Sequence, residues 1–169
     1  TNFEYYQALK EDAELQKLYR QLMLRYEFAW YGHYEVKSED WQQTMNFYGM
    51  QTRYYSFDLK GFHFVFLDGN DPNPQPWSGY NRYIGGEQLE WLKADLEKTK
   101  APTLIFSHQT LEDPSAGVYN AKAIQTVLET ENQKAGFLKI IACFSGHNHT
   151  NYLTQINGIH YCQINSASY

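Results

Sequence analysis

The sequence places two histidines two positions apart, His147 and His149, in the segment 144–149 (FSGHNH), directly after an apolar run. Neutral imidazole is a common ligand for zinc, iron and manganese. In an extended stretch of chain, residues two apart point to the same side, so these rings could share one metal ion or serve two adjacent ions. Gly146 lets the backbone turn sharply before them. Two exposed histidines on an ordinary loop are the alternative interpretation.

A third histidine occupies a similar position elsewhere in the chain. His108 ends the segment 104–108 (LIFSH), which is another apolar run followed directly by an imidazole. Open sheets bind ligands where their strands end, so the three rings are expected to converge at one end of a sheet. His63 and His160 lie inside apolar runs instead, and we interpret them as packed structural residues.

The segment 31–35 (YGHYE) also follows a short apolar run, 28–31. His33 and Glu35 add an imidazole and a carboxylate to the candidate ligands, and Tyr34 adds a phenol. The alternative interpretation is an ordinary turn between a strand and a loop.

The elements that must position these residues follow from hydrophobic periodicity. Apolar residues at three- and four-residue steps predict helices over 3–26, 87–98 and from a capping Asn120 to about 133. Alternating or continuous apolar runs predict strands over 28–31, 55–59, 62–67, 103–106, 138–144, 152–156 and 159–164. Turns at Lys60-Gly61 and Asn157-Gly158 join two pairs of these strands as hairpins. The segment 69–86 is predicted to be a long loop.

Length and composition indicate one α+β domain with a mixed sheet and outer helices. The chain has 169 residues, of which 43% are hydrophobic and 17% aromatic, which favours strands and excludes a disordered class. Its net charge of -5 argues against a broad nucleic-acid interface, and no apolar run is long enough for a membrane span. Cys143 and Cys162 lie in apolar runs and are predicted to be thiols. Localisation and oligomeric state are not indicated.

The ordered set of motifs resembles the last three motifs of the calcineurin-like metallophosphoesterases. The chain shows a G-x-x-E segment at 32–35, a strand ending in His108 and the GHNH segment at 146–149, in that order. The segments 54–58 (YYSFD), 61–68 (GFHFVFLD), 87–92 (EQLEWL) and 157–161 (NGIHY) also resemble that family. The resemblance covers nearly all of residues 26–167, so residues 1–169 are interpreted as the C-terminal portion of such a domain.

The resemblance implies a four-layer αββα fold and a site with two adjacent divalent ions, Mn, Fe or Zn. It implies hydrolysis of a small-molecule phosphate mono- or diester, with the two cations neutralising the phosphoryl oxygens and activating water. By the family pattern, His33, His108, His147 and His149 would be metal ligands. His33, Tyr34 and Glu35 would form the catalytic segment.

Two departures from the family pattern stand out. The first two motifs, D-x-H and G-D-x-x-D, are absent and would lie upstream of Thr1, together with the aspartate that bridges the metals. The third motif is G-N-H-[DE] in the family, whereas the chain has Gly32-His33-Tyr34-Glu35. His33 then stands at a metal-binding asparagine, and Tyr34 at a histidine that protonates the leaving group or binds phosphate. A shifted register, with His33 as the family's histidine, is the alternative, and the position of Glu35 favours the first alignment.

Three functional interpretations follow. The leading one is a phosphoesterase whose site is complete only with an upstream segment, so that this chain alone would bind its metals incompletely. The second is a degenerate, non-catalytic relative that binds a metal or a partner. The third is a compact domain of its own, or an oligomer in which another chain covers the sheet.

Overall fold

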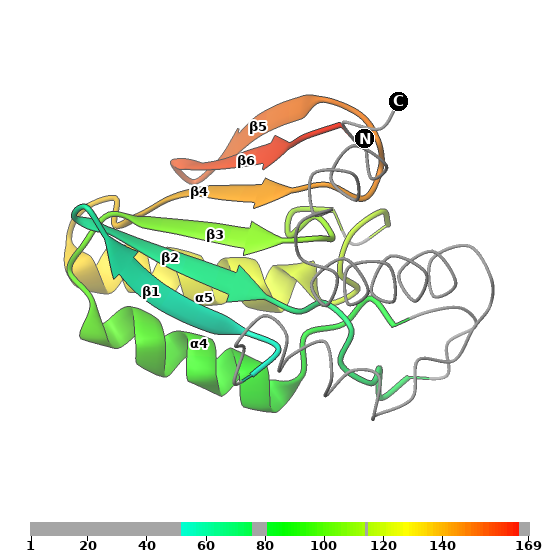
Figure 1. Cartoon of the computed structure of the whole chain (residues 1–169), viewed down its shortest axis with the longest axis horizontal. Coiled ribbons are helices and arrows are strands. Elements are labelled where there is room, and N and C mark those ends of the chain that lie inside the picture. The colour runs from blue at the N-terminus through cyan, green and yellow to red at the C-terminus, as the bar shows by residue number, and fades with distance from the viewer. Residues whose placement is uncertain (1–51, 76–80, 114, 166–169) are drawn as a thin grey trace, which may run out of the picture. The chain divides into compact units, whose positions relative to one another are not determined.

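The structure is a computed structural model that describes residues 52–75, 81–113 and 115–165. These residues form a six-stranded mixed sheet with two helices, which confirms the predicted α+β class (Figure 1). The strands are β1 (Tyr55–Leu59), β2 (Phe62–Leu67), β3 (Thr103–Ser107), β4 (Ile140–Ser145), β5 (Tyr152–Ile156) and β6 (Ile159–Gln163). The helices are α4 (Gly86–Lys98) and α5 (Ala121–Ala135). The predicted helix at 3–26 and strand at 28–31 lie outside the described residues.

The sheet has the strand order β1-β2-β3-β4-β6-β5. Its four central strands, β2, β3, β4 and β6, run parallel to one another, and the edge strands β1 and β5 run antiparallel to their neighbours. The carboxyl ends of the four central strands therefore meet at one edge. We call this the carboxyl edge; it carries the segments that follow Leu67, Ser107, Ser145 and Gln163.

Both predicted hairpins are confirmed. Lys60 and Gly61 join β1 to β2, and both have positive φ, as do Asn157 and Gly158 between β5 and β6. Positive φ at both central residues is typical of the two-residue turn that matches the twist of the flanking strands. The Asn-Gly pair adopts this conformation at little steric cost, which is why the sequence predicts this turn.

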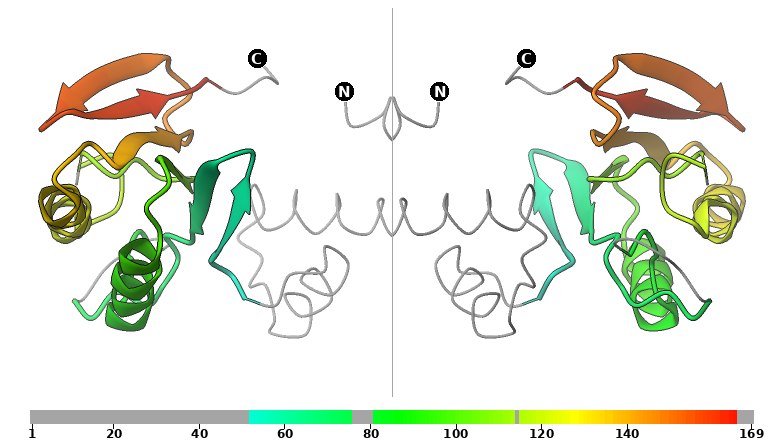
Figure 2. Two further views of the ribbon diagram at one scale, coloured as in Figure 1. Left: turned by 90° about the vertical axis from the view of Figure 1, so that its left-hand side faces the viewer. Right: turned by 90° about the vertical axis from the view of Figure 1, so that its right-hand side faces the viewer.

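The core lies between one face of the sheet and the two helices. Figure 2 shows α4 and α5 on the same side of the sheet. Val65 and Ile105 of the sheet, Leu92 of α4, and Ile124 and Leu128 of α5 are fully buried there. Burying one such side chain contributes about 1.5–3 kcal/mol, so this layer is the main source of stability of the described part.

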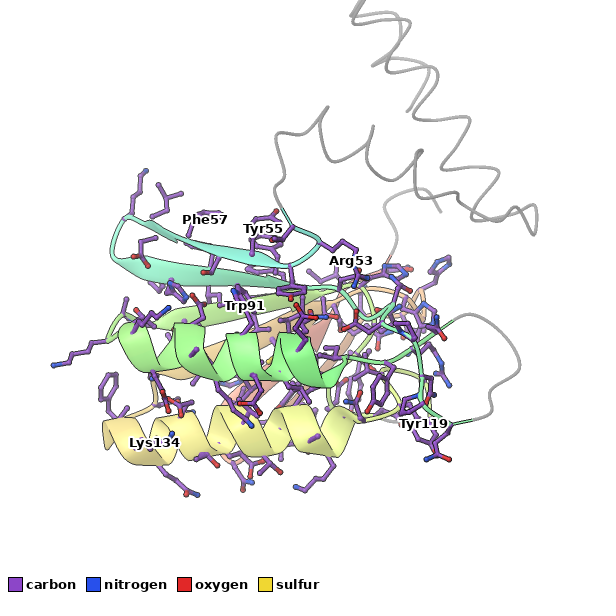
Figure 3. All side chains as sticks on the ribbon, turned by 90° about the horizontal axis from the view of Figure 1, so that it is seen from below. Arg53, Tyr55, Phe57, Trp91, Tyr119 and Lys134 are labelled. Carbon is purple, nitrogen blue, oxygen red and sulfur yellow. The ribbon has the colours of Figure 1, made fainter. Side chains whose placement is uncertain are left out.

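The opposite face of the sheet carries a row of stacked rings, which we call the aromatic face. Neighbouring rings across β1 to β4 lie 4.8 to 6.2 Å apart, within 18° of parallel. Figure 3 shows Tyr55 and Phe57 on the side away from α4. The rings on this face are those of Tyr55, Phe57, Phe64, Phe66, Phe106 and Phe144. Neither described helix covers this face.

The predicted cap at Asn120 is wrong in its chemistry. The helix does begin after Asn120, but the Asn120 side chain makes no capping hydrogen bond. Its amide instead donates to the Ile84 carbonyl (2.7 Å) and accepts from the Ile84 N–H (3.1 Å). Asn120 therefore ties the segment before α4 to the start of α5, a long-range use that local sequence does not reveal.

The three remaining residue predictions concern packing. Cys143 and Cys162 are free thiols. Cys143 is buried and Cys162 is half-buried. His63 is buried near the start of β2, at the end of the strand opposite the carboxyl edge, and His160 lies within β6 beside Gln155.

Within the described ranges, no helix is both long and apolar enough to cross a membrane.

His63 is held by side chains rather than by the backbone. Its Nδ1 lies 2.8 Å from Asp58 and its Nε2 lies 2.9 Å from Asp95 of α4. We expect His63→Ala to lower the free energy of unfolding by about 1–3 kcal/mol, because the buried His63 ring is lost and the mostly buried Asp95 carboxylate loses its partner. Urea denaturation measures this. The exposed pair Lys93–Glu90 is the control, because Lys93→Gln should cost about 0.5 kcal/mol or less. Equal costs for the two substitutions would contradict this role of His63.

Candidate metal centre

The histidines that follow β3 and β4 meet at the carboxyl edge. His147 Nδ1 lies 3.3 Å from His108 Nε2, with the ring centroids 5.2 Å apart and the ring planes at 74°. The Gly146 N–H donates to the His108 carbonyl (3.0 Å), which links the two loops beneath the rings. The predicted convergence therefore holds for His108 and His147.

His149, the third histidine expected at this edge, lies near the pair. It lies close enough for its charge to influence both His108 and His147. In the described ranges, however, no three His, Cys, Asp or Glu side chains are placed to share one metal ion. Within the described residues, the candidate ligands of one ion are therefore the two rings of His108 and His147. His33, Tyr34 and Glu35 lie outside the described residues.

The backbone of the GHNH segment differs from the predicted extended conformation. His147 and His149 both have positive φ, 72° and 52°. A non-glycine residue in this region is uncommon and costs of order 1 kcal/mol, and such residues concentrate at functional sites. The two rings are therefore positioned by left-handed turns, and not by the alternation of an extended strand.

The electrostatics at the edge favour neutral imidazoles. Desolvation, with smaller contributions from the charges of His147 and His149, lowers the pKa of His108. Desolvation, the nearby charge of Arg82 and that of His149 lower the pKa of His147. Neutral imidazole is the form that binds metal, so both rings are held in the ligand form at neutral pH.

The spacing of the two ring nitrogens fits a shared ion. Two nitrogen ligands at about 2.0–2.1 Å from one tetrahedral zinc ion lie about 3.3–3.4 Å apart. The observed separation is 3.3 Å, whereas an N–H···O bond typically has a donor–acceptor distance of about 2.9–3.0 Å. The donor set, two nitrogens from different loops, suits zinc, iron or manganese.

Sequence reasoning missed a second polar group at the same edge, directly after β2. Arg53 lies 2.5 Å from Asp68 and 2.5 Å from Asp71. Asp71 is buried and also accepts from the Gly85 N–H (2.7 Å) and the Gln88 amide (2.8 Å). These contacts occupy the carboxylates, so the group fixes the loop between β2 and α4. The sequence does mark the position of Asp68, because Asp68 follows an apolar strand just as His108 does.

The lowered pKa of His108 predicts a pH dependence of stability. An unfolded imidazole, with a pKa of 6.5, binds a proton more readily than folded His108, so protonation favours unfolding. This penalty is absent well above pH 6.5 and grows as the pH falls through 6.5 toward the lower pKa of the folded state. Urea denaturation in EDTA at several pH values should show a smaller loss of stability on acidification for His108→Gln than for the unmodified chain. Equal losses would contradict the desolvated environment.

Comparison with solved structures gives several matches, among them a phosphatase. The chain superimposes on the crystal structure of a dimetal phosphatase from Danio rerio with a TM-score of 0.52 and 21% sequence identity, over 66% of this chain and 48% of that protein. The chain thus spans about half the length of that phosphatase. No protein-family model and no curated protein matches the chain. The described residues therefore share their fold with a dimetal phosphatase.

Proposed function

We propose that this chain is the C-terminal part of a calcineurin-like metallophosphoesterase that hydrolyses phosphate mono- or diesters at a site with two divalent ions. The observation that carries the proposal is the 3.3 Å approach of His108 and His147 at the carboxyl edge, in loops that correspond to two of the family's motifs. The fold shared with a dimetal phosphatase supports it. Mn, Fe or Zn would suit the ligands.

In this proposal His108 and His147 hold one ion, and His149, just beyond them, serves the other. His33 of the G-x-x-E segment adds a ligand, and Tyr34 and Glu35 act beside the substrate phosphate. When bound, the ions neutralise the phosphoryl oxygens and lower the pKa of water. What the chain itself supplies is a pair of neutral rings, pre-oriented by positive-φ turns and by the Gly146–His108 backbone bond.

The proposal also includes the four-layer αββα arrangement. The aromatic face is a continuous apolar surface of the kind that packs against another layer, and larger apolar patches mark such interfaces. An upstream segment carrying D-x-H and G-D-x-x-D would supply that layer together with the bridging aspartate.

The coding sequence of the parent protein provides a direct test. We expect it to encode D-x-H and G-D-x-x-D motifs upstream of Thr1, each after a predicted strand. Carboxylates are needed because two adjacent divalent ions repel each other and the described ligands are neutral. A parent sequence without these motifs would contradict the half-site proposal.

The second candidate function is a degenerate relative that binds a metal or a partner without catalysis. The specific observation that favours it is Tyr34 in place of the family's histidine. A phenol with a pKa of about 10 can donate a hydrogen bond but is poorly matched to proton transfer at neutral pH.

A further inference from the structure

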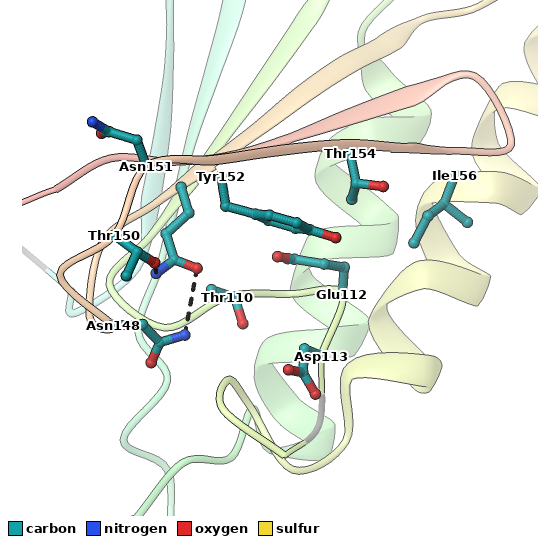
Figure 4. Close-up of a pocket in the computed structure, with 10 residues that line it drawn as sticks. Thr110, Glu112, Asp113, Asn148, Thr150, Asn151, Tyr152, Thr154 and Ile156 are labelled. Carbon is teal, nitrogen blue, oxygen red and sulfur yellow. Dashed lines mark hydrogen bonds between the residues drawn. The ribbon is translucent and has the colours of Figure 1, made fainter.

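A pocket of about 640 Å³ lies on the helix-facing side of the sheet (Figure 4). Four segments build its walls, one of them the end of β6 at Gln163. Thr110 and Glu112 come from the segment after β3, Asn148 comes from the loop after β4, and Tyr152 and Thr154 come from β5. This volume is typical of sites for small molecules.

Two residues that line the pocket lie close in the sequence to histidines of the candidate metal centre. Thr110 follows His108 by two residues, and Asn148 lies between His147 and His149 in the sequence. The same two loops therefore carry the imidazoles and the polar side chains of the pocket. A molecule bound at the histidines has this pocket as its neighbour.

The chemistry of the walls excludes an anionic ligand. Glu112 and Asp113 contribute two carboxylates, and none of the described residues that line the pocket is Lys, Arg or His. The remaining polar groups are hydroxyls and amides, which both donate and accept. Two amides are pre-oriented, because Asn148 donates to Gln163 (3.4 Å) and Gln163 donates to Thr150 (3.2 Å).

One wall residue has an unused hydrogen-bonding group. Thr110 is 1% exposed, and its Oγ1 makes no hydrogen bond to any part of the chain that the structure describes. This hydroxyl lies against Gly117 and is closed off from the pocket, so its burial costs about 1–3 kcal/mol without offering a contact to a ligand. Burial raises the pKa of the half-buried Glu112 carboxyl, which is open to the pocket.

We propose that this pocket binds the alcohol half of the phosphate ester and that this half is an uncharged sugar ring. The hydroxyls of a sugar donate and accept on adjacent carbons, which matches the carboxylate of Glu112 and the amide of Asn148. The apolar face of the ring would lie on Tyr152, which is 51% exposed. The inference rests on the proposed function, since it takes the phosphate to be held at the histidines.

Saturation-transfer NMR on the full 169-residue chain tests the proposal with three probes: methyl β-D-ribofuranoside, methyl β-D-glucopyranoside and choline. We expect one of the two sugars to bind and choline not to bind. Tyr152→Ala and Glu112→Gln should each weaken sugar binding about tenfold, the value of one good contact.

Two matched variants outside the pocket serve as controls. Tyr119 is 46% exposed and Glu90 is exposed on α4, and neither lines the pocket. Tyr119→Ala and Glu90→Gln should leave sugar binding within about twofold of the unmodified chain, since a residue without contact contributes little.

The outcomes separate this inference from the proposed function. Choline binding that is lost in Glu112→Gln would overturn the sugar assignment in favour of a cation site. Normal zinc binding at His108 and His147 with no sugar binding would overturn the pocket proposal alone. Sugar binding that depends on Glu112 and Tyr152 in a chain that binds no metal would support the pocket and contradict the phosphoesterase.

Discussion

Hydrolysis of p-nitrophenyl phosphate by the 169-residue chain should stay near the background rate with Mn²⁺ or Zn²⁺ present. It should appear when the chain is produced with an upstream segment that carries D-x-H and G-D-x-x-D. The reason is electrostatic, because two divalent ions a few ångströms apart repel strongly unless anionic ligands lie between them. In the proposed site the ligands from this chain are neutral imidazoles, so both ions cannot be held in place without the added carboxylates.

The same assay separates the missing segment from the altered third motif. In the extended protein, Tyr34→His combined with His33→Asn should raise the rate about 10²–10⁴-fold, the usual contribution of one general acid. Activity that appears only after this double substitution would favour the degenerate interpretation. Robust, metal-dependent turnover by the 169-residue chain alone would contradict the half-site proposal, and EDTA provides the control for metal dependence.

Zinc affinity should fall at least about 100-fold in His147→Ala. Substituting a residue that only hydrogen-bonds to a metal ligand typically lowers metal affinity about 10–100-fold. Removing one of the two direct ligands should lower it at least as much. Isothermal titration calorimetry of the 169-residue chain measures this directly. His108→Ala should give a similar loss, because both rings serve the same ion in the proposed site.

His160→Ala is the matched control for this measurement. His160 lies within β6, with its ring 3.2 Å from the Gln155 amide, and it is not part of the pair at the carboxyl edge. Its removal should leave zinc affinity unchanged within about twofold, as expected for a residue outside the site. An equal loss of affinity in all three variants would mean that zinc binds to histidines nonspecifically.

The secondary structure followed closely from local patterns. Alternation in β1, the apolar run of β3 and the Asn157-Gly158 turn predicted elements that the structure confirms within about two residues. The strand order and the parallel arrangement of β2, β3, β4 and β6 were not predicted, because periodicity shows which residues are buried but not which strands are neighbours. The arrangement matters, because parallel strands bring His108 and His147 to the same edge.

The candidate site was predicted in part. The position of His108 and His147 directly after apolar strands was enough to place them together. The left-handed conformation of His147 and His149 was not predicted, because non-glycine residues rarely adopt it and no local signal marks it. The Arg53 group was also missed, since its contacts span 15 and 18 residues and depend on how the loop after β2 folds back.

Anomalous diffraction from crystals grown with zinc tests the central claim most directly, namely that His108 and His147 bind one divalent ion. The account predicts an anomalous peak about 2.0–2.1 Å from both His108 Nε2 and His147 Nδ1, the usual zinc–imidazole distance. Zinc bound only elsewhere, with the rings of His108 and His147 unligated, would contradict it.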